Sequence, residues 1–251
     1  MRLAPISVLG PKLLNFSTSD SVQEMALGSI VQASGTDYDT TANVANWGMA
    51  ELVYVANASV AIPPGTMCVI DKNFRVLASA AKATENNTGK PIFIALTNFA
   101  AGSTDVQYGW VLRRGVAPVA YSVAATAGPL YAGTAGKATP TAATGAQILN
   151  AQCLIAGAST FTRSGTTLTG SSKVKFGNVA GMFVGQAISG TGIPASSVIS
   201  DIDASGNSVV IGSAVGTPVS ATATGTVTVT MTNTNFGIVQ LDYPFYQGQI
   251  T

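Results

Sequence analysis

Residues 226–231 read Thr-Val-Thr-Val-Thr-Met, so polar and apolar side chains alternate through the whole run. A period of two is typical of a β-strand that is buried on one face and exposed on the other. On the N-terminal side of this run, back to Ser159, short segments rich in Gly, Ser, Thr and Val are separated by turn residues. They include Lys173-Val-Lys-Phe176, Ser197-Val-Ile-Ser200 and Ser208-Val-Val-Ile211. The pattern predicts a compact β-sandwich module.

Aromatic residues are sparse within this module and return at Phe236. Other runs that predict strands precede the module, at residues 49–60, 67–70, 91–98, 106–112, 116–123 and 146–156. The module therefore interrupts a first β-rich domain, which C-terminal residues complete. We predict an all-β (mainly β) chain with a β-sandwich or β-barrel-like core domain over 29–157 plus 234–251. A second β-sandwich module, over 158–233, is inserted in it and is expected to project outward.

Residues 1–28 have an irregular pattern, and Pro5, Gly10 and Pro11 exclude a helix around them. Two interpretations stay open: a loosely packed terminus, or an extended arm that becomes ordered on a partner. The best helix candidate in the chain is the short segment Ser19–Leu27, which begins with residues suited to cap a helix. The contact residues of an arm would be its apolar side chains, Leu3, Ile6, Leu9, Leu13, Leu14 and Phe16.

Charged residues make up only 9% of the 251 residues, whereas ordinary globular domains carry about 25%. The 12 basic and 11 acidic residues leave a formal net charge of +1. Uncharged polar residues must therefore cover most of the surface. A free monomer usually needs more charge to stay dispersed, so this composition favours an oligomer or a lattice component.

Neither nucleic acid nor a membrane is an expected partner. The densest basic spots are Arg113-Arg114 and Lys173 with Lys175, and electrostatic capture of nucleic acid needs larger clusters. No stretch of about 18 consecutive strongly apolar residues occurs. The first residues, Met1–Phe16, are interrupted by Pro and Gly, unlike the apolar region of a secretory signal. We therefore expect synthesis in the cytoplasm without export.

The chain contains no histidine, which removes the usual general base and the commonest metal ligand. Asp37 and Asp39 lie two residues apart in a loop-like region, so they cannot take opposite walls of a catalytic cleft. The Gly136-Lys137 pair is followed by Ala138, where a phosphate-binding loop needs Ser or Thr. We expect no enzyme activity, no catalytic residue, no cofactor and no small-molecule substrate.

Residues 201–207, Asp-Ile-Asp-Ala-Ser-Gly-Asn, imitate the start of a calcium-binding loop. An EF-hand needs a bidentate Glu at its twelfth position, and that position here is Gly212. A hairpin turn is the simpler interpretation, and no metal site is expected.

Cys68 and Cys153 each lie in an apolar run, which indicates buried thiols, although the sequence leaves open whether they pair.

Arg113-Arg114 follows Tyr108-Gly-Trp110 and is the one polar and aromatic cluster worth noting. On a strand the two arginines point to opposite faces. One of them could contact a carboxylate of a partner, because arginine is enriched in interfaces. The alternative is one surface charge and one side chain packed along the sheet.

The stretch Trp110-Val-Leu-Arg-Arg-Gly-Val-Ala-Pro-Val119, followed by Ala127-Gly-Pro-Leu-Tyr131, Gly136-Lys-Ala-Thr139 and Ala146-Gln-Ile-Leu149, resembles phage head decoration proteins. In that family a strand ending in Gly-Val-Ala precedes a Gly-Asp-Pro-Val-Tyr-like segment, a Gly-Lys-Val-Thr turn and a closing strand. Here the Asp of the second segment is missing. The resemblance covers roughly Ile62–Gly157 plus Asn235–Phe245.

The inserted module resembles a different group of phage proteins. Val184-Gly-Gln-Ala-Ile-Ser-Gly-Thr-Gly-Ile-Pro194, followed by Val198-Ile-Ser-Asp-Ile-Asp203, is similar to a repeat common in tail fibres and surface-displayed virion proteins. This second resemblance is the more specific of the two.

Together the resemblances imply a structural protein of the bacteriophage virion, made in the host cytoplasm. As a homotrimeric capsid decoration (cement) protein it would bind the major capsid protein on the capsid surface and bridge coat subunits. The alternative is a phage tail-fibre or receptor-binding protein that recognises host surface carbohydrate, although the module lacks Trp. Besides the apolar arm, the expected contact residues are Arg113, Arg114, Tyr243, Phe245 and Tyr246.

Overall fold

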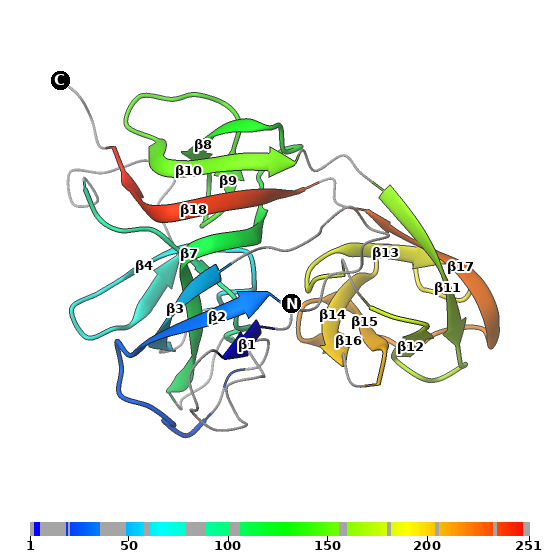
Figure 1. The fold of residues 1–251 in the computed structure, drawn as a ribbon. Helices are drawn as coiled ribbons and strands as arrows, with labels where there is room; N and C mark the ends of the chain where they lie inside the picture. The colour runs from blue at the N-terminus through cyan, green and yellow to red at the C-terminus, as the bar shows by residue number, and fades with distance from the viewer. Residues whose placement is uncertain are drawn as a thin grey trace. The chain divides into compact units, whose positions relative to one another are not determined.

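The structure is a computed structural model. It describes residues 3–5, 19, 21–35, 49–57, 61–78, 89–100, 106–155, 160–179, 182–203, 206–232 and 235–247. Within these ranges every regular element is a β-strand, which confirms the all-β class (Figure 1).

The helix predicted at Ser19–Leu27 is wrong, since the described part of this segment forms bends and turns. The backbone N–H of Glu24 donates a hydrogen bond to the hydroxyl of Tyr54, at 3.1 Å. A segment this short is marginal as an isolated helix. The N–H of Glu24 is therefore bound to Tyr54 instead of taking part in a first helical turn.

The chain divides into two compact units. We call the described residues from 160 to 232 the barrel unit, and the described residues before 156 and after 234 the core unit. The core unit contains an 11-stranded antiparallel sheet with the order β1-β2-β3-β7-β18-β10-β8-β9, and β4, β5 and β6 branch from it. Its strands are β1 (Leu3–Pro5), β2 (Ile30–Gly35), β3 (Met49–Asn57), β4 (Met67–Ile70), β5 (Val76–Ala78), β6 (Phe93–Ala95), β7 (Gln107–Ala120), β8 (Gly128–Ala132), β9 (Ala138–Thr139), β10 (Gln147–Ile155) and β18 (Phe236–Tyr246).

Strand β3 is buried on both faces along most of its length, from Leu52 to Asn57. Successive side chains of a strand point to opposite faces. Val53 and Val55 therefore enter one apolar cluster, which also contains Cys68, Phe93 and Val111. Tyr54 points to the other face, where its ring centroid lies 5.0 Å from that of Trp110. The near-continuous apolar sequence of β3 follows from burial on both sides.

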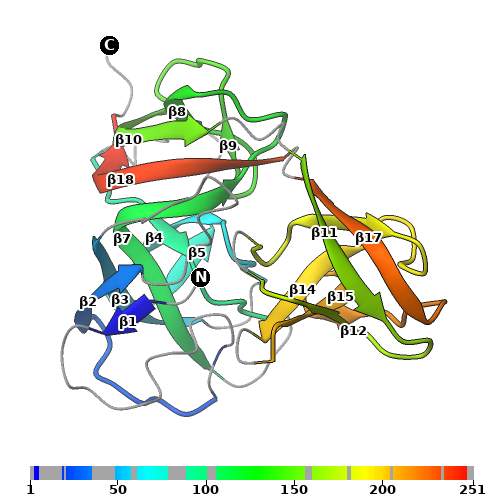
Figure 2. The same ribbon diagram turned by 45° about the vertical axis from the view of Figure 1, so that its right-hand side comes forward.

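The C-terminal strand β18 lies between β7 and β10, so the last part of the chain completes a sheet that earlier residues begin (Figure 2). Its pairing with β7 runs from Phe236↔Ala120 to Asp242↔Arg114. This register places residues that are more than a hundred positions apart in the sequence directly beside one another.

The barrel unit consists of a single 7-stranded antiparallel sheet with the order β12-β11-β17-β13-β14-β15-β16. Strand β12 also pairs with β15, which closes six of the strands into a barrel and leaves β16 outside the ring. The two-sheet sandwich predicted for this segment is therefore replaced by a closed barrel. Its strands are β11 (Thr160–Thr167), β12 (Lys173–Phe176), β13 (Ala187–Gly190), β14 (Val198–Asp203), β15 (Ser208–Ala214), β16 (Thr217–Pro218) and β17 (Gly225–Thr232).

The alternating run in β17 takes its expected arrangement. Val229 and Met231 are fully buried in the barrel core, whereas Thr226 and Thr228 are exposed. Strand β11 pairs with β17 over its whole length, from Thr160↔Thr232 to Thr167↔Gly225. The outer surface of this strand pair therefore carries uncharged hydroxyl side chains opposite one another, which is a favourable cross-strand pairing.

The barrel unit interrupts a pair of neighbouring core strands. Ile155, the last residue of β10, pairs with Ile238 near the start of β18. In the barrel unit, Thr160 at the start of β11 pairs with Thr232 at the end of β17. The chain thus leaves the core sheet and returns to it on adjacent strands.

Candidate contact surface

A β-bulge in β7 places two arginines on the same part of the core sheet. In the pairing of β3 with β7, Glu51 lies opposite Arg114 and Leu52 lies opposite Leu112, so Arg113 is the extra residue. A bulge locally re-aims side chains. The guanidinium carbons of Arg113 and Arg114 lie 4.6 and 5.8 Å from the ring centroid of Tyr243. The prediction that the two arginines point to opposite faces is therefore wrong, because it assumed a regular strand.

Glu51 contacts both Arg113 and Tyr243. Its carboxylate forms an ion pair with Arg113, with Nη1 3.3 Å from Oε1. Its other oxygen, Oε2, accepts a hydrogen bond from the hydroxyl of Tyr243 at 3.1 Å. Only 12% of the Glu51 side chain is exposed, compared with 37% of Arg113. Partial burial and charge-assisted hydrogen bonding make this a firmly held ion pair.

Arg114 forms a second and more exposed ion pair, with its Nε 3.1 Å from Oδ1 of Asp242. The side chains of Arg114 and Asp242 are 54% and 63% exposed. Exposed pairs of this kind contribute only about 0–1 kcal/mol, because water and salt screen the charges. We call Glu51, Arg113, Arg114, Asp242 and Tyr243 the Arg-Tyr cluster.

Tyr243 has an unusual backbone conformation, with φ of +54°. A bulky side chain at positive φ is an outlier that persists only where surrounding contacts hold it. Here those contacts are the hydrogen bond to Glu51 and the two arginines beside the ring. Tyr243 as a whole nevertheless stays 40% exposed. The cluster therefore presents an aromatic ring and two guanidinium groups in a fixed arrangement at the surface.

The structure places the predicted contact residues differently. Arg113, Arg114 and Tyr243 come together in the Arg-Tyr cluster, and Phe245 is half-buried. Tyr246 is fully buried, because it lies opposite Ile148 within the sheet, so its prediction as a contact residue is wrong. Leu3 lies in β1, which pairs with β2. The remaining arm residues, Ile6, Leu9, Leu13, Leu14 and Phe16, are outside the described residues.

Sequence reasoning missed Glu51 and Asp242. Neither lies near an arginine in the sequence, and neither belongs to a recognisable motif. They join the cluster because Arg114 pairs with Glu51 on one side and with Asp242 on the other. Only the strand order, with β7 between β3 and β18, reveals this row of charges.

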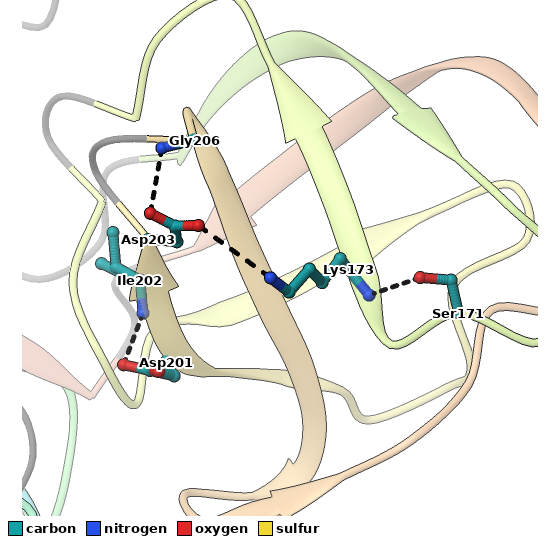
Figure 3. Close-up of polar contacts among 6 residues, drawn as sticks. All are labelled: Ser171, Lys173, Asp201, Ile202, Asp203 and Gly206. Atoms are coloured by element: carbon teal, nitrogen blue, oxygen red, sulfur yellow. Dashed lines mark hydrogen bonds and ion pairs between the residues drawn. The ribbon is translucent and has the colours of Figure 1, made fainter.

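In the calcium-like segment of the barrel unit, Asp201–Asp203 are the last residues of β14 and Gly206 lies in a turn (Figure 3). Asp203 accepts a hydrogen bond from the N–H of Gly206 at 2.9 Å, and its other carboxylate oxygen lies 3.9 Å from Nζ of Lys173. Asp201 accepts a hydrogen bond from the N–H of Ile202 at 2.8 Å. No group of three or more metal-binding side chains occurs in the described ranges.

Cys68 and Cys153 are both buried free thiols, which answers the question of pairing that the sequence left open. Burial raises the pKa of Cys68 well above its ordinary value of 9.0. The pKa of Tyr121 is also raised, first by burial and then by the neighbouring thiol of Cys153. Both groups therefore stay protonated and unreactive in the folded core.

A scan of protein-family models, a search of curated proteins and a search of solved structures gave no match to this chain. Among the described residues, no helix is long and apolar enough to cross a membrane.

Proposed function

We propose that this chain is a bacteriophage capsid decoration protein that binds the outer surface of an assembled capsid. The observation that carries the proposal is the Arg-Tyr cluster, which offers a prearranged contact on a broad antiparallel sheet. Two sequence features support it: the resemblance of residues 110–149 to phage head decoration proteins, and the unusually low charge of the chain.

The composition and the fixed geometry of the cluster both suit a protein interface. Tyr and Arg are the residue types most often found at the energetic centre of protein interfaces. Binding loses less conformational entropy when such side chains are already held in place. Glu51 provides this restraint, because it contacts both Arg113 and Tyr243.

Decoration would stabilise the capsid by mass action. A ligand that binds the assembled shell and not its free subunits shifts the equilibrium toward the shell. Contacts with two neighbouring copies of the major capsid protein would bridge them. A homotrimer would multiply the contact, because its copies bind the same shell together. In this proposal the protein functions on the virion surface and has no catalytic role.

The second candidate is a tail-fibre or receptor-binding protein that recognises host surface carbohydrate. The observation in its favour is the row of uncharged hydroxyl side chains along β11 and β17, which could form hydrogen bonds with sugars. Against it, Leu168 is the one large apolar residue of the barrel unit found exposed within the described ranges, so none of its aromatic residues there is among the exposed ones.

The test incubates purified protein with empty capsids that lack it and measures co-sedimentation and the melting temperature of the capsid. We expect saturable binding and a higher melting temperature. R113A/R114A should weaken binding by at least ~10-fold, because it removes two interface side chains. The matched control is K173A/K175A, which removes two cations from the barrel unit and should bind normally. Absence of capsid binding, with retention on host cells or glycans, would establish the second candidate instead.

A further inference from the structure

We draw no further inference here: the strongest candidate, the row of exposed hydroxyl side chains along β11 and β17 on the outer surface of the barrel unit, is an unpartnered sheet face, and nothing in the structure shows what covers it.

Discussion

At Gly115 the backbone of β7 passes very close to β3 immediately after the bulge. Its φ is +123°, and a Cβ atom there would lie 3.1 Å from the Cα of Ala50 and 3.2 Å from the carbonyl oxygen of Met49. Both neighbours are backbone atoms, which cannot move aside without shifting the strand. Any side chain at this position therefore disturbs the pairing that brings Arg114 opposite Glu51.

We predict that G115A lowers the free energy of unfolding of the core unit by about 2–4 kcal/mol, from backbone strain together with steric overlap. Gly128 provides a matched control, because its φ of +128° is similar but a Cβ there meets no atom within 4 Å. G128A should therefore cost only the strain, about 1 kcal/mol. Urea unfolding followed by tryptophan fluorescence measures both variants. Equal losses in the two variants would show that the contact with Ala50 has no effect.

We also predict that the core unit loses stability in alkaline solution. Cys68 and Tyr121 have raised pKa values in the folded state, whereas their ordinary values are 9.0 and 10.0. Above pH 9 the unfolded chain therefore releases protons that the folded chain retains. The stability is fully present below pH 9 and falls with rising pH by up to ~1.4 kcal/mol per pH unit for each group.

Urea unfolding between pH 8 and pH 10.5 measures this dependence. Y121F should remove the contribution of the tyrosine above pH 10 and leave a shallower slope, while C68A should remove the contribution that begins near pH 9. A wild-type stability that stays constant over this interval would contradict the prediction.

The residues of the contact surface were only partly predictable from the sequence. Arg113, Arg114 and Tyr243 could be selected because arginine and tyrosine are typical of interfaces. Glu51 and Asp242 could not, since their roles depend on the register of two non-local strand pairs. The burial of Tyr246 was not predicted, because an aromatic C-terminal segment is typical both of an exposed tail and of a buried strand.

At the scale of single elements, the short strand β12 decides whether the barrel is closed. It pairs with β11 through Gly165↔Phe176 and with β15 through Val174↔Val209. A strand with neighbours on both sides has no free edge, and Pro is excluded from such positions because it cannot donate a hydrogen bond.

We predict that V174P opens the barrel unit, whereas V174A only weakens it. Val174 is fully buried, so truncation to Ala should cost about 2–3 kcal/mol and leave the strand pairing intact. Pro adds the loss of a backbone hydrogen bond in the middle of the closing strand. Hydrogen exchange followed by mass spectrometry should show fast exchange in the peptides of residues 160–232 of V174P and unchanged protection in the core unit. Protection of the barrel peptides in V174P would show that β12 is dispensable for closure.

The strands could be predicted from the sequence more easily than the pairing between them. The alternation in residues 226–231 identified β17 and its buried face, because that pattern is a local property. The pairing of β12 with β15 has no local signal, so a barrel could not be distinguished from a sandwich. The helix predicted at Ser19–Leu27 failed for a related reason, since the contact of Glu24 with Tyr54 is non-local.

At the scale of the whole molecule, the insertion point allows the two units to be separated. Ile155 and Ile238 are paired, so β10 and β18 are already neighbours in the sheet on the two sides of the inserted residues. We predict that replacing these residues with a short Gly-Asn-Gly linker leaves the core unit folded, as a hairpin of β10 and β18. If the proposed function is right, the shortened protein should also keep its affinity for capsids.

Tryptophan fluorescence is the appropriate measurement, because both tryptophans, Trp47 and Trp110, lie outside the deleted segment. The urea midpoint reported by fluorescence should match that of the full chain. In the full chain, circular dichroism should report an additional transition that is absent after the deletion. Loss of the native fluorescence in the shortened protein would show that the core unit needs the barrel unit to fold.

The same insertion point has a mechanical consequence. A pulling force applied to the barrel unit enters the core through β10 and β18 together, and it draws both strands in the same direction. The two strands then do not slide past one another, and the load passes to their outer neighbours, β8 and β7. When the force lies along the strands, the hydrogen bonds of those outer ladders are loaded in shear and resist it jointly. A barrel unit attached in this way can bear a pulling force while β10 and β18 stay paired within the core sheet.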